Sequence, residues 1–501
     1  MLFERKRGAD GEVTRHKRRF LACGNDQVAG RDHVDVRAPA ARHATMRAVL
    51  STAAASRMVL YQLDVETAFL NGTVDEELYF QQPRGYERGG ARKVCRLVKA
   101  IYRLKQAARA WYLTLVELME QMRMTQCTSD LCLFTRRGAD GDAKYLLVYV
   151  DDILMMGRTK AAIESMKQTV TAAFSSRDIW PPSFFVGLHI GRDQVGGTLK
   201  VSQHKYILSL VERHGLGNTH PVVLPIGVRA LLTKEGVTLD EAGTTHYQEL
   251  LRGLLYVAQC TRPDISFAVG NLARHASAPT QTHAILAKGV LKYLKSTSQI
   301  WLRYAAAGVL TGYCDNYFAE DVDTRLSKTG YAFLLNTAAI SWIRKAQPTV
   351  AVSTTEAENN TAFMAVREAL WLRTLVRKLG GGSKAVPMLC DNQGAIKRMH
   401  NPAGTAWSEH IDVAHHFVRD RVAGGQLTVE YIPTAEMVAD VLTKPLPSAL
   451  LASCRQGLGV VPVYDRAVPG WECWRSGGGT SGTHGLEGGP DQRDQAWAVC
   501  D

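Results

Sequence analysis

The fold is decided by one stretch, Lys144-Tyr-Leu-Leu-Val-Tyr-Val-Asp151-Asp152-Ile-Leu-Met-Met-Gly157. Two apolar runs flank two adjacent carboxylates, a pattern that predicts a β-hairpin turning at Asp151 and Asp152, since Asp tolerates the positive φ of tight turns. Successive residues of a strand point to opposite faces, so the two carboxylates share a side only if a turn intervenes. Burying carboxylates in so apolar a hairpin is costly without a cation. The stretch therefore indicates either a cation site or a plain solvent-exposed Asp-Asp turn.

The box Tyr149-Val-Asp-Asp152 resembles the polymerase box of reverse transcriptases, and six other segments stand in the order and at the spacing of copia-type retrotransposons. These segments are Leu63-Asp-Val-Glu-Thr-Ala-Phe-Leu-Asn-Gly72, Leu104-Lys-Gln-Ala-Ala-Arg-Ala-Trp-Tyr112, Thr261-Arg-Pro-Asp-Ile265, Ser353-Thr-Thr-Glu-Ala-Glu358, Cys390-Asp-Asn-Gln393 and Ala439-Asp-Val-Leu-Thr-Lys-Pro445. One such motif would be a weak signal, but six in order are a specific one. Residues 1–447 thus resemble the reverse transcriptase and ribonuclease H region of the Pol polyprotein of copia-type (pseudovirid) LTR retrotransposons.

The resemblance implies an α/β (α+β) fold, with a right-hand polymerase palm, partial fingers and a thumb/connection, followed by a ribonuclease H-like α/β domain. The expected domains are partial fingers and palm over 1–225, a helical thumb/connection-like region over 226–308 and the ribonuclease H-like domain over 309–446. Beyond these the resemblance stops. Gly-rich sequence without a period predicts a disordered tail over 447–501.

The composition is that of a globular protein with a basic surplus. The 501 residues are 46% hydrophobic and 22% charged, and they carry a net charge of +12 with a pI near 9.2. Half of that surplus lies in residues 1–60, which hold 12 Lys and Arg against 6 Asp and Glu. This excess favours polyanionic partners such as nucleic acid, and the alternative is a solvated basic face.

The cysteines and the apolar runs indicate the compartment. Ten cysteines are scattered without a Cys-x-x-Cys pair or a zinc-like His/Cys cluster, which predicts reduced intracellular thiols. No secretory leader opens the chain, and no apolar run approaches the ~20 residues that a bilayer requires. We expect a protein of the cytoplasm or nucleus without a membrane partner.

The strand-like residues 60–70 contain Asp64, and an Asp inside a buried strand is unusual unless it is paired or binds a metal. The resemblance makes Asp64 the first palm carboxylate. We therefore expect Asp64 and Asp151 to bridge two Mg²⁺ (or Mn²⁺) ions, with Asp152 supporting them from the turn. Hard divalent ions prefer carboxylate oxygens, and two of them suffice for attack of a primer 3′-hydroxyl on a deoxynucleoside triphosphate.

The resemblance also implies substrate contacts around this centre. Lys17 and Arg19 lie in a strand-like basic segment that suits phosphate contact. Phe69 stands where the family places a bulky residue under the sugar, which would exclude a 2′-hydroxyl; simple core packing is the alternative. Gln106 is expected to contact the incoming nucleotide and Arg109 the nucleic acid.

A second set of carboxylates belongs to the ribonuclease H-like region, where the pattern from residue 310 reads strand, strand, helix, strand, helix. The spacing of Ser353 and Glu356 predicts a capping box at the start of a helix, which leaves Glu358 as the free carboxylate. The resemblance then implies a second centre that holds two Mg²⁺ ions and directs water onto the RNA strand of an RNA-DNA hybrid. Its residues are Asp315, Glu358, Asp391 and Asp440.

The expected partners are an RNA template, a DNA primer, the RNA-DNA hybrid, deoxynucleoside triphosphates and other products of the retroelement polyprotein. Some positions depart from the family pattern. Cys23 replaces a usual Lys, Arg103 a usual Gly and Asn359 a usual aromatic residue. These departures, a short fingers region and the unrelated tail leave an alternative open, in which the chain is a truncated, catalytically inactive relic that at most binds nucleic acid.

Overall fold

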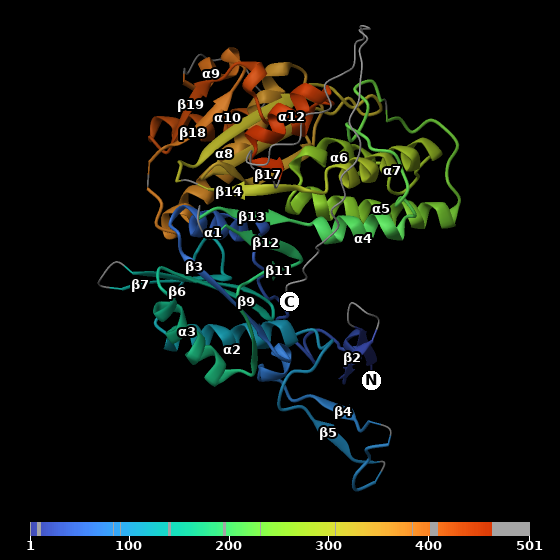
Figure 1. The fold of residues 1–501 in the computed structure, drawn as a ribbon, viewed down its shortest axis with the longest axis vertical. Helices are drawn as coiled ribbons and strands as arrows, with labels where there is room; N and C mark the ends of the chain where they lie inside the picture. Colours follow the sequence, from blue (N-terminus) through green and yellow to red (C-terminus); the bar gives the residue numbers. More distant parts are fainter. Residues whose placement is uncertain are drawn as a thin grey trace, which may run out of the picture. The chain divides into compact units, whose positions relative to one another are not determined.

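Figure 1 shows the computed structural model of the chain. It describes residues 2–7, 12–83, 85–90, 92–138, 142–193, 197–230, 232–305, 307–382, 384–400 and 409–462. Near the N-terminus two hairpins form from β1 (Leu2–Arg7) with β2 (Val13–Arg19) and from β4 (Tyr79–Gln81) with β5 (Val94–Arg96). A short 3-10 helix, η1 (Gly24–Asp26), lies between them along the chain.

A six-stranded antiparallel sheet contains the stretch Lys144–Gly157. Its strand order is β10-β3-β9-β8-β7-β6. The strands are β3 (Val59–Val65), β6 (Thr125–Gln126), β7 (Leu133–Arg137), β8 (Ala143–Tyr149), β9 (Asp152–Gly157) and β10 (Ser176–Ile179). The helices around it are α1 (His43–Ala55), η2 (Ala68–Asn71), α2 (Ala107–Gln121) and α3 (Lys160–Ala173).

Alternation along β8 explains why helices cover both faces of this sheet. Leu146 and Val148 pack with Trp111 of α2 in one core, whereas Tyr145 and Leu147 pack on the other face in the core that contains α1. Because all four side chains are buried, residues 145–148 of β8 are continuously apolar rather than alternating with polar residues. The predicted β8–β9 hairpin is confirmed, with Tyr149 paired to Asp152 across the turn.

The hairpin turns one residue earlier than predicted. Val150 and Asp151 form the loop, and it is Val150 that takes the positive φ, at +58°. Two hydrogen bonds hold it there: Trp111 Nε1 donates to the Val150 carbonyl at 2.7 Å, and the Val65 amide donates to the Asp151 carbonyl at 2.8 Å. These buried contacts impose a conformation that a β-branched residue rarely adopts, so the tolerance of Asp for positive φ does not decide the turn.

A second sheet has the order β11-β12-β13-β14-β20. Its strands are β11 (Phe184–Phe185), β12 (Leu188–Arg192), β13 (Leu199–Ser202), β14 (Ile300–Tyr304) and β20 (Val460–Pro462). The helices between β13 and β14 are α4 (His204–Arg213), α5 (Glu241–Cys260), η3 (Pro263–Ile265), α6 (Ser266–Ala273) and α7 (Gln281–Ser296). The segment Thr261-Arg-Pro-Asp264 separates α5 from α6, and Arg262 there forms a fully buried ion pair with Asp264 at 2.7 Å.

The third sheet has the order β17-β16-β15-β18-β19, in which β18 runs parallel to both of its neighbours. Its strands are β15 (Thr311–Tyr317), β16 (Lys328–Leu335), β17 (Ala338–Ala346), β18 (Val386–Cys390) and β19 (Leu427–Tyr431). Its helices are α8 (Thr354–Lys378), α9 (Gln393–His400), α10 (Glu409–Ala423), η4 (Thr434–Glu436) and α11 (Asp440–Thr443). Three strands, not the predicted two, precede the long helix, because a tight turn at Asn336 and Thr337 splits β16 from β17.

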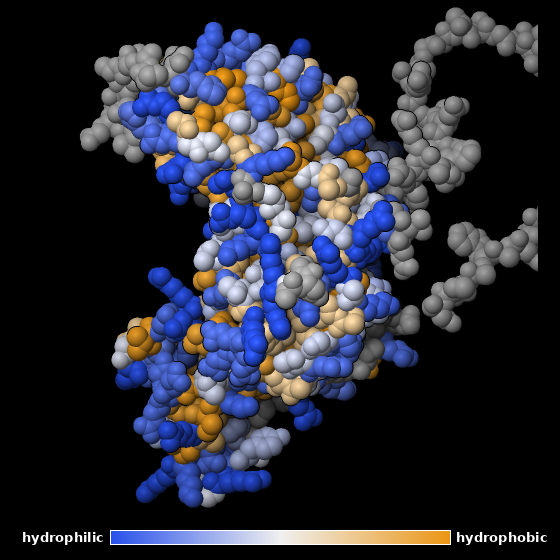
Figure 2. Space-filling view, turned by 90° about the vertical axis from the view of Figure 1, so that its left-hand side faces the viewer, coloured by the Kyte–Doolittle hydropathy of each residue, from blue (hydrophilic) through white to orange (hydrophobic). Residues whose placement is uncertain are grey.

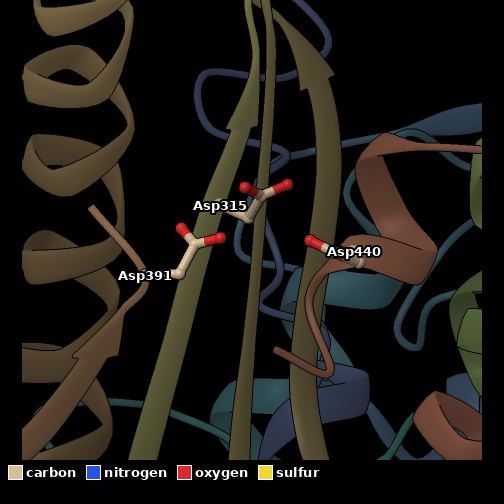
Figure 3. A group of neighbouring side chains, drawn as sticks. All are labelled: Asp315, Asp391 and Asp440. Atoms are coloured by element: carbon tan, nitrogen blue, oxygen red, sulfur yellow. The ribbon is translucent and has the colours of Figure 1, made fainter. Parts of the chain in front are cut away.

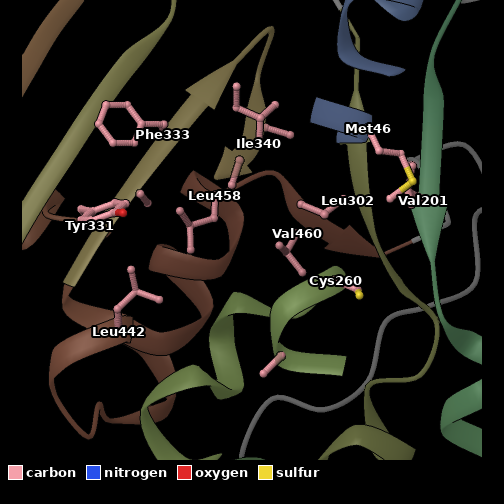
Figure 4. Packing of buried hydrophobic residues seen from close by; sticks show 14 of the residues in the cluster. Met46, Val201, Cys260, Leu302, Tyr331, Phe333, Ile340, Leu442, Leu458 and Val460 are labelled. Carbon is pink, nitrogen blue, oxygen red and sulfur yellow. The ribbon is translucent and has the colours of Figure 1, made fainter. Parts of the chain in front are cut away.

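The prediction of a disordered tail over 447–501 is wrong for its first part, while residues 463–501 lie outside the described residues. Residues 448–462 form α12 (Ser448–Gly457) and β20, which pairs with β14. Leu451, Cys454, Leu458 and Val460 are buried in the main core, as Figure 4 shows for Leu458 and Val460. The chain therefore stays folded beyond residue 447, where the family resemblance stops.

The main core runs from α1 through the second sheet into the third. Arg47 of α1 is fully buried, and its guanidinium donates to the carbonyls of Ile340, Gln259 and Cys260 at 2.7, 2.8 and 2.9 Å. Residues Met1–Val463 accordingly form one compact unit, and the domain boundaries at 225, 308 and 446 stay a prediction. The mixed α/β fold class is confirmed. Among the described helices we find none whose length and hydropathy suit a membrane span.

Two candidate carboxylate centres

The first centre lies where β3, β9 and the hairpin turn meet. Asp64 of β3 stands directly opposite Asp152, the first residue of β9, and Asp151 precedes it in the turn. Directly opposed residues of antiparallel strands bring their Cβ atoms to within about 5 Å. The fold therefore gathers the three predicted carboxylates at one end of the six-stranded sheet.

Electrostatics distinguish Asp152 within this centre. Burial raises the pKa of its carboxyl to about 6, the hydrogen bond from Gln62 opposes that shift, and the charges of Asp151 and Asp64 add to it. Gln62 is buried, and its Nε2 donates to Asp152 Oδ1 at 2.9 Å. A carboxylate that is both desolvated and next to two others favours a bound cation.

The predicted nucleotide contact, Gln106, sits at the N-terminus of α2 with only 4% of its surface exposed. Its Nε2 donates to the Asp32 carbonyl at 2.9 Å and to Glu76 Oε2 at 3.3 Å, and its Oε1 accepts from Gln27 Nε2 at 3.0 Å. The amide is thus engaged by the protein itself, and a role toward the nucleotide stays a prediction.

The other predicted substrate residues lie nearby in the chain's N-terminal part. Half-buried Phe69 makes an edge contact with Tyr102, at 5.5 Å between ring centroids. Arg19 also lies over the Tyr102 ring, at 5.5 Å. Arg109 forms an ion pair with Asp35 at 3.3 Å. Lys17 belongs to β2, and its side chain is outside the described residues.

The second centre brings Asp315, Asp391 and Asp440 together, as Figure 3 shows. One carboxylate oxygen from each lies within 4.8 Å of the others. Asp315 comes from β15, Asp391 follows the neighbouring parallel strand β18, and Asp440 opens α11. The register of adjacent parallel strands places the first two side by side, and the short helix adds the third from across the sheet edge.

Two residues next to Asp440 in the chain complete the polar surroundings. The Lys444 ammonium lies 2.8 Å from Asp440 Oδ1 and 3.3 Å from Asp315 Oδ1. The Thr443 hydroxyl donates to the other oxygen of Asp315. Burial raises the pKa of Asp315 to about 7 although Lys444 opposes the shift, and burial likewise raises the pKa of Asp440. The Lys444 ammonium therefore partly neutralises the negative charge of Asp315 and Asp440.

Glu358 lines the same small hollow as Asp315 and Asp391 but stands apart from the cluster of three. The Asn392 side-chain amide donates to Glu358 Oε1. At the start of the same helix the Ser353 hydroxyl accepts from the Glu356 amide at 3.2 Å. The Glu356 carboxylate in turn accepts from the Val352 amide at 2.9 Å, one residue before the cap residue. The Ser353 half of the predicted capping box is therefore confirmed, whereas Glu356 holds the residue that precedes the cap.

The residues present suit divalent cations. Asp315, Asp391 and Asp440 can hold a metal ion, with Glu358 close by, and their oxygen donors are those that Mg²⁺ and Mn²⁺ prefer. Sequence reasoning missed Gln62, Asn392, Thr443 and Lys444 as parts of the two centres. Three of these stand inside the quoted motifs, so their position in the sequence was the one available signal.

A sheet with opposed carboxylates beside its hairpin, followed along the chain by a mixed sheet with a second carboxylate cluster, is the arrangement expected from the sequence for a reverse transcriptase with a ribonuclease H-like domain. Residues 1–228 match the family described as "Reverse transcriptase (RNA-dependent DNA polymerase)". The chain is 36% identical over 466 residues to the retrovirus-related Pol polyprotein from transposon TNT 1-94 of Nicotiana tabacum, covering 92% of this chain and 35% of that protein.

It is also 31% identical over 311 residues to a putative transposon Ty5-1 protein of Saccharomyces cerevisiae, covering 61% of this chain and 100% of that protein. The chain therefore belongs to the copia-type retrotransposon Pol family. It spans about a third of the length of the Pol polyproteins that it matches. A foamy viral protease-reverse transcriptase solved with dsDNA shows a weak likeness, with 12% identity, a TM-score of 0.41 and coverage of 75% of this chain and 67% of that one.

Proposed function

We propose that this chain is an RNA-directed DNA polymerase whose ribonuclease H-like domain degrades the RNA strand of RNA-DNA hybrids. The observation that carries the proposal is the pairing of Asp64 with Asp152 beside Asp151, together with the convergence of Asp315, Asp391 and Asp440. The proposal needs one carboxylate centre for DNA synthesis and another for cleavage of the RNA strand, and the two centres lie on different sheets. Divalent ions, two at each centre, would activate the attacking oxygen and stabilise the leaving one.

In the polymerase centre Asp64 and Asp151 would hold the ions, and Asp152 would support them from β9. The hydrogen bond from Gln62 restrains the orientation of the Asp152 carboxylate. The backbone bonds at Val150 and Asp151 hold the turn itself. The chain therefore preorganises its charges, which lowers the cost of reorganisation during the reaction.

In the second centre Asp315, Asp391, Asp440 and Glu358 would hold the ions. Thr443 and Lys444 orient Asp315, and Asn392 orients Glu358. The Thr434 hydroxyl donates to Asp391 Oδ2 at 3.0 Å and restrains that carboxylate. The 2′-hydroxyl of RNA is the group that would distinguish the strand to be cleaved from DNA.

The substrates in this proposal are an RNA template, a DNA primer, their hybrid and deoxynucleoside triphosphates, and other products of the polyprotein are the expected protein partners. Lys17, Arg19, Phe69, Gln106 and Arg109 remain the residues proposed to meet substrate. The eight cysteines of the described part of the chain are free thiols, which supports work in the cytoplasm or nucleus.

The test is incorporation of deoxynucleotides on an RNA template with a DNA primer, in Mg²⁺ and in Mn²⁺, by wild type and Asp151→Asn. We expect incorporation by the wild type and its loss in the variant, because the metal centre would lose one of its charged ligands. Circular dichroism of both proteins controls for folding. Incorporation by Asp151→Asn at the wild-type rate would refute the assignment, and none by folded wild type would favour an inactive relic.

A further inference from the structure

A strongly basic hollow lies at the junction of the first sheet and the third. It measures about 600 Å³ and is lined by two threonines and five cations, namely Arg123, Arg136, Arg137, Arg377 and Lys378. Arg123 follows α2, Arg136 and Arg137 end β7, and Arg377 and Lys378 end α8. No Asp or Glu lines the hollow. Segments some 240 residues apart thus bring like charges together, which costs free energy unless an anion is bound.

The five cations are not neutralised within the described part of the chain. None of them forms an ion pair with another described residue, and the four arginines are exposed. Arg136 Nη1 donates to the Met122 carbonyl at 3.1 Å, and Arg137 Nη2 donates to the Arg377 carbonyl at 3.5 Å. Each of these bonds uses one of the five N–H groups of a guanidinium and leaves the others for a ligand.

The positive charge continues along the neighbouring strand. Lys144 of β8 stands directly opposite Arg136 of β7. Directly opposed like charges destabilise a strand pair, so this arrangement also calls for a counter-anion. Figure 2 views the side of the molecule on which β6 and β7 lie in Figure 1, and it shows strongly hydrophilic side chains gathered over the middle of this face.

The hollow is remote from both carboxylate centres. The polymerase carboxylates lie at the far end of β8, six residues or about 20 Å from Ala143, which pairs with Arg137. Glu358 lies near the start of α8, about 28 Å from Arg377 at a rise of about 1.5 Å per residue. The hollow therefore belongs to neither centre.

We propose that this hollow binds the phosphate backbone of single-stranded RNA. Clustered guanidinium groups match phosphate oxygens bidentately. A flexible single strand can bend into a concave site, whereas a duplex is stiff over this distance. No aromatic ring lines the hollow, so the contact is with phosphates rather than stacked bases and carries no sequence preference.

On the proposed function, this strand is the unpaired part of the RNA template. The hollow lies about 20 Å from the polymerase carboxylates, so template RNA bound there stays on the protein while the primer end is released and rebound. The site should then raise processivity on long templates. It should not change single-nucleotide addition on a primer-template whose overhang is a single unpaired nucleotide, too short to reach the hollow.

The experiment measures fluorescence anisotropy of a labelled uridine oligoribonucleotide against the full chain, between about 50 and 200 mM salt. The variant is Arg136→Gln/Arg137→Gln/Arg377→Gln. A control with the same loss of charge is Arg229→Gln/Lys234→Gln/Arg252→Gln, whose three residues are exposed in the helical region. We expect about tenfold weaker binding for the variant and a salt slope shallower by about 2, since each lost phosphate contact removes about 0.7. The control should bind as wild type.

Equal binding by variant and control would overturn the proposal, as would an equal loss for blunt DNA duplex. A second measurement needs no variant: RNA should protect Arg136, Arg137 and Arg377 of the wild type from phenylglyoxal, read by mass spectrometry. Modification that RNA does not slow would also overturn it.

All binding is measured in an Asp151→Asn background as well. RNA binding at the hollow by a wild-type chain that incorporates no deoxynucleotide would leave this inference standing while the proposed function fails. The reverse outcome, incorporation without RNA protection of the arginines, would leave the proposed function standing.

Discussion

Asp152 and Asp315 are carboxyl groups that the fold withdraws from water, and burial raises their pKa values to about 6 and about 7. Each lies among other carboxylates, so ionisation without a cation is unfavourable at both centres. Evolution tolerates such a cost where function requires it. Removal of divalent ions should therefore change the ionisation of these two residues most.

Asp152→Asn should stabilise the metal-free protein at neutral pH. The folded-state pKa lies above the unfolded value of about 3.9, so the ionised group costs stability at pH 7, and that cost disappears below about pH 4. In chelator, the gain in unfolding free energy should grow from pH 4 to 6 and then level off near 1 kcal/mol, a value discounted for partial solvent contact. Denaturant unfolding across this range measures it. A gain that is the same at every pH would contradict the assignment.

Lys444→Met should tighten divalent metal binding at the second centre at least tenfold. The ammonium lies within 3.3 Å of oxygens of both Asp315 and Asp440, so a divalent ion must displace or oppose it. Mn²⁺ titration followed by electron paramagnetic resonance, in an Asp151→Asn background, gives the affinity. Lys444→Arg, which keeps the charge, is the control and should bind as wild type. Weaker binding by Lys444→Met would show that the lysine supports the ions.

Arg103→Gly should raise the unfolding free energy by about 1 kcal/mol. Arg103 holds a φ of +69°, a left-handed conformation that costs a residue with a Cβ atom about this much. The side chain is exposed, so little else is lost. Arg103→Ala keeps the Cβ atom and should bring no gain. Equal stabilisation by both variants in urea unfolding would refute the backbone explanation.

Most carboxylates of the two centres can be predicted from the sequence, because a carboxylate within or next to an apolar strand is unusual. Asp64, Asp152 and Asp391 are placed by strand patterns that the structure contains. The positive φ of Val150 is not predictable, because it depends on Trp111, 39 residues away in sequence. The contact of Lys444 is not predictable either, although the residue stands inside a quoted motif, since only the tertiary approach of α11 to β15 brings it to Asp315.

At the scale of elements, α1 and α12 join parts of the chain that the motifs keep separate. Arg47 ties α1 to β17 and to the end of α5. Arg455 of α12 donates to the Tyr293 hydroxyl at 3.2 Å, and Tyr293 donates to Asp264 at 2.7 Å. Residues of α12 thereby extend the hydrogen-bond network of the buried Arg262–Asp264 pair.

A chain that ends at residue 447 should be at least ~4 kcal/mol less stable than one that ends at 462. It loses four buried apolar side chains, each of which contributes about 1.5 kcal/mol or more. It also loses the edge strand of the second sheet and leaves β14 unpaired on that side. Urea unfolding of the two truncated proteins measures the difference. Equal midpoints would show that α12 and β20 contribute nothing.

Elements with a clear period are found from sequence, and those defined by tertiary contact are not. The helical period of residues 45–57 and 161–174 is visible in the sequence, and these segments form α1 and α3. The third strand before α8 was missed because the apolar residues 331–335 of β16 and 338–340 of β17 are separated only by Asn336 and Thr337. β20 was missed because three residues in a Gly-flanked segment show no period.

At the scale of the whole molecule, two centres with separate carboxylates share one core. Buried side chains of one continuous cluster extend from Met46 in α1 to Val460 in β20 (Figure 4). The proposed reactions are nevertheless independent, because no carboxylate belongs to both centres. Loss of one charge should therefore silence one reaction and leave both the fold and the other reaction in place.

The most direct measurement follows DNA synthesis and RNA cleavage together on one RNA template annealed to a DNA primer. Wild type, Asp151→Asn and Asp391→Asn are compared, with equal thermal stability as the control. We predict that Asp151→Asn loses synthesis but still cleaves a preformed hybrid, whereas Asp391→Asn synthesises but leaves the RNA intact. Loss of both reactions in either folded variant would contradict two separable centres.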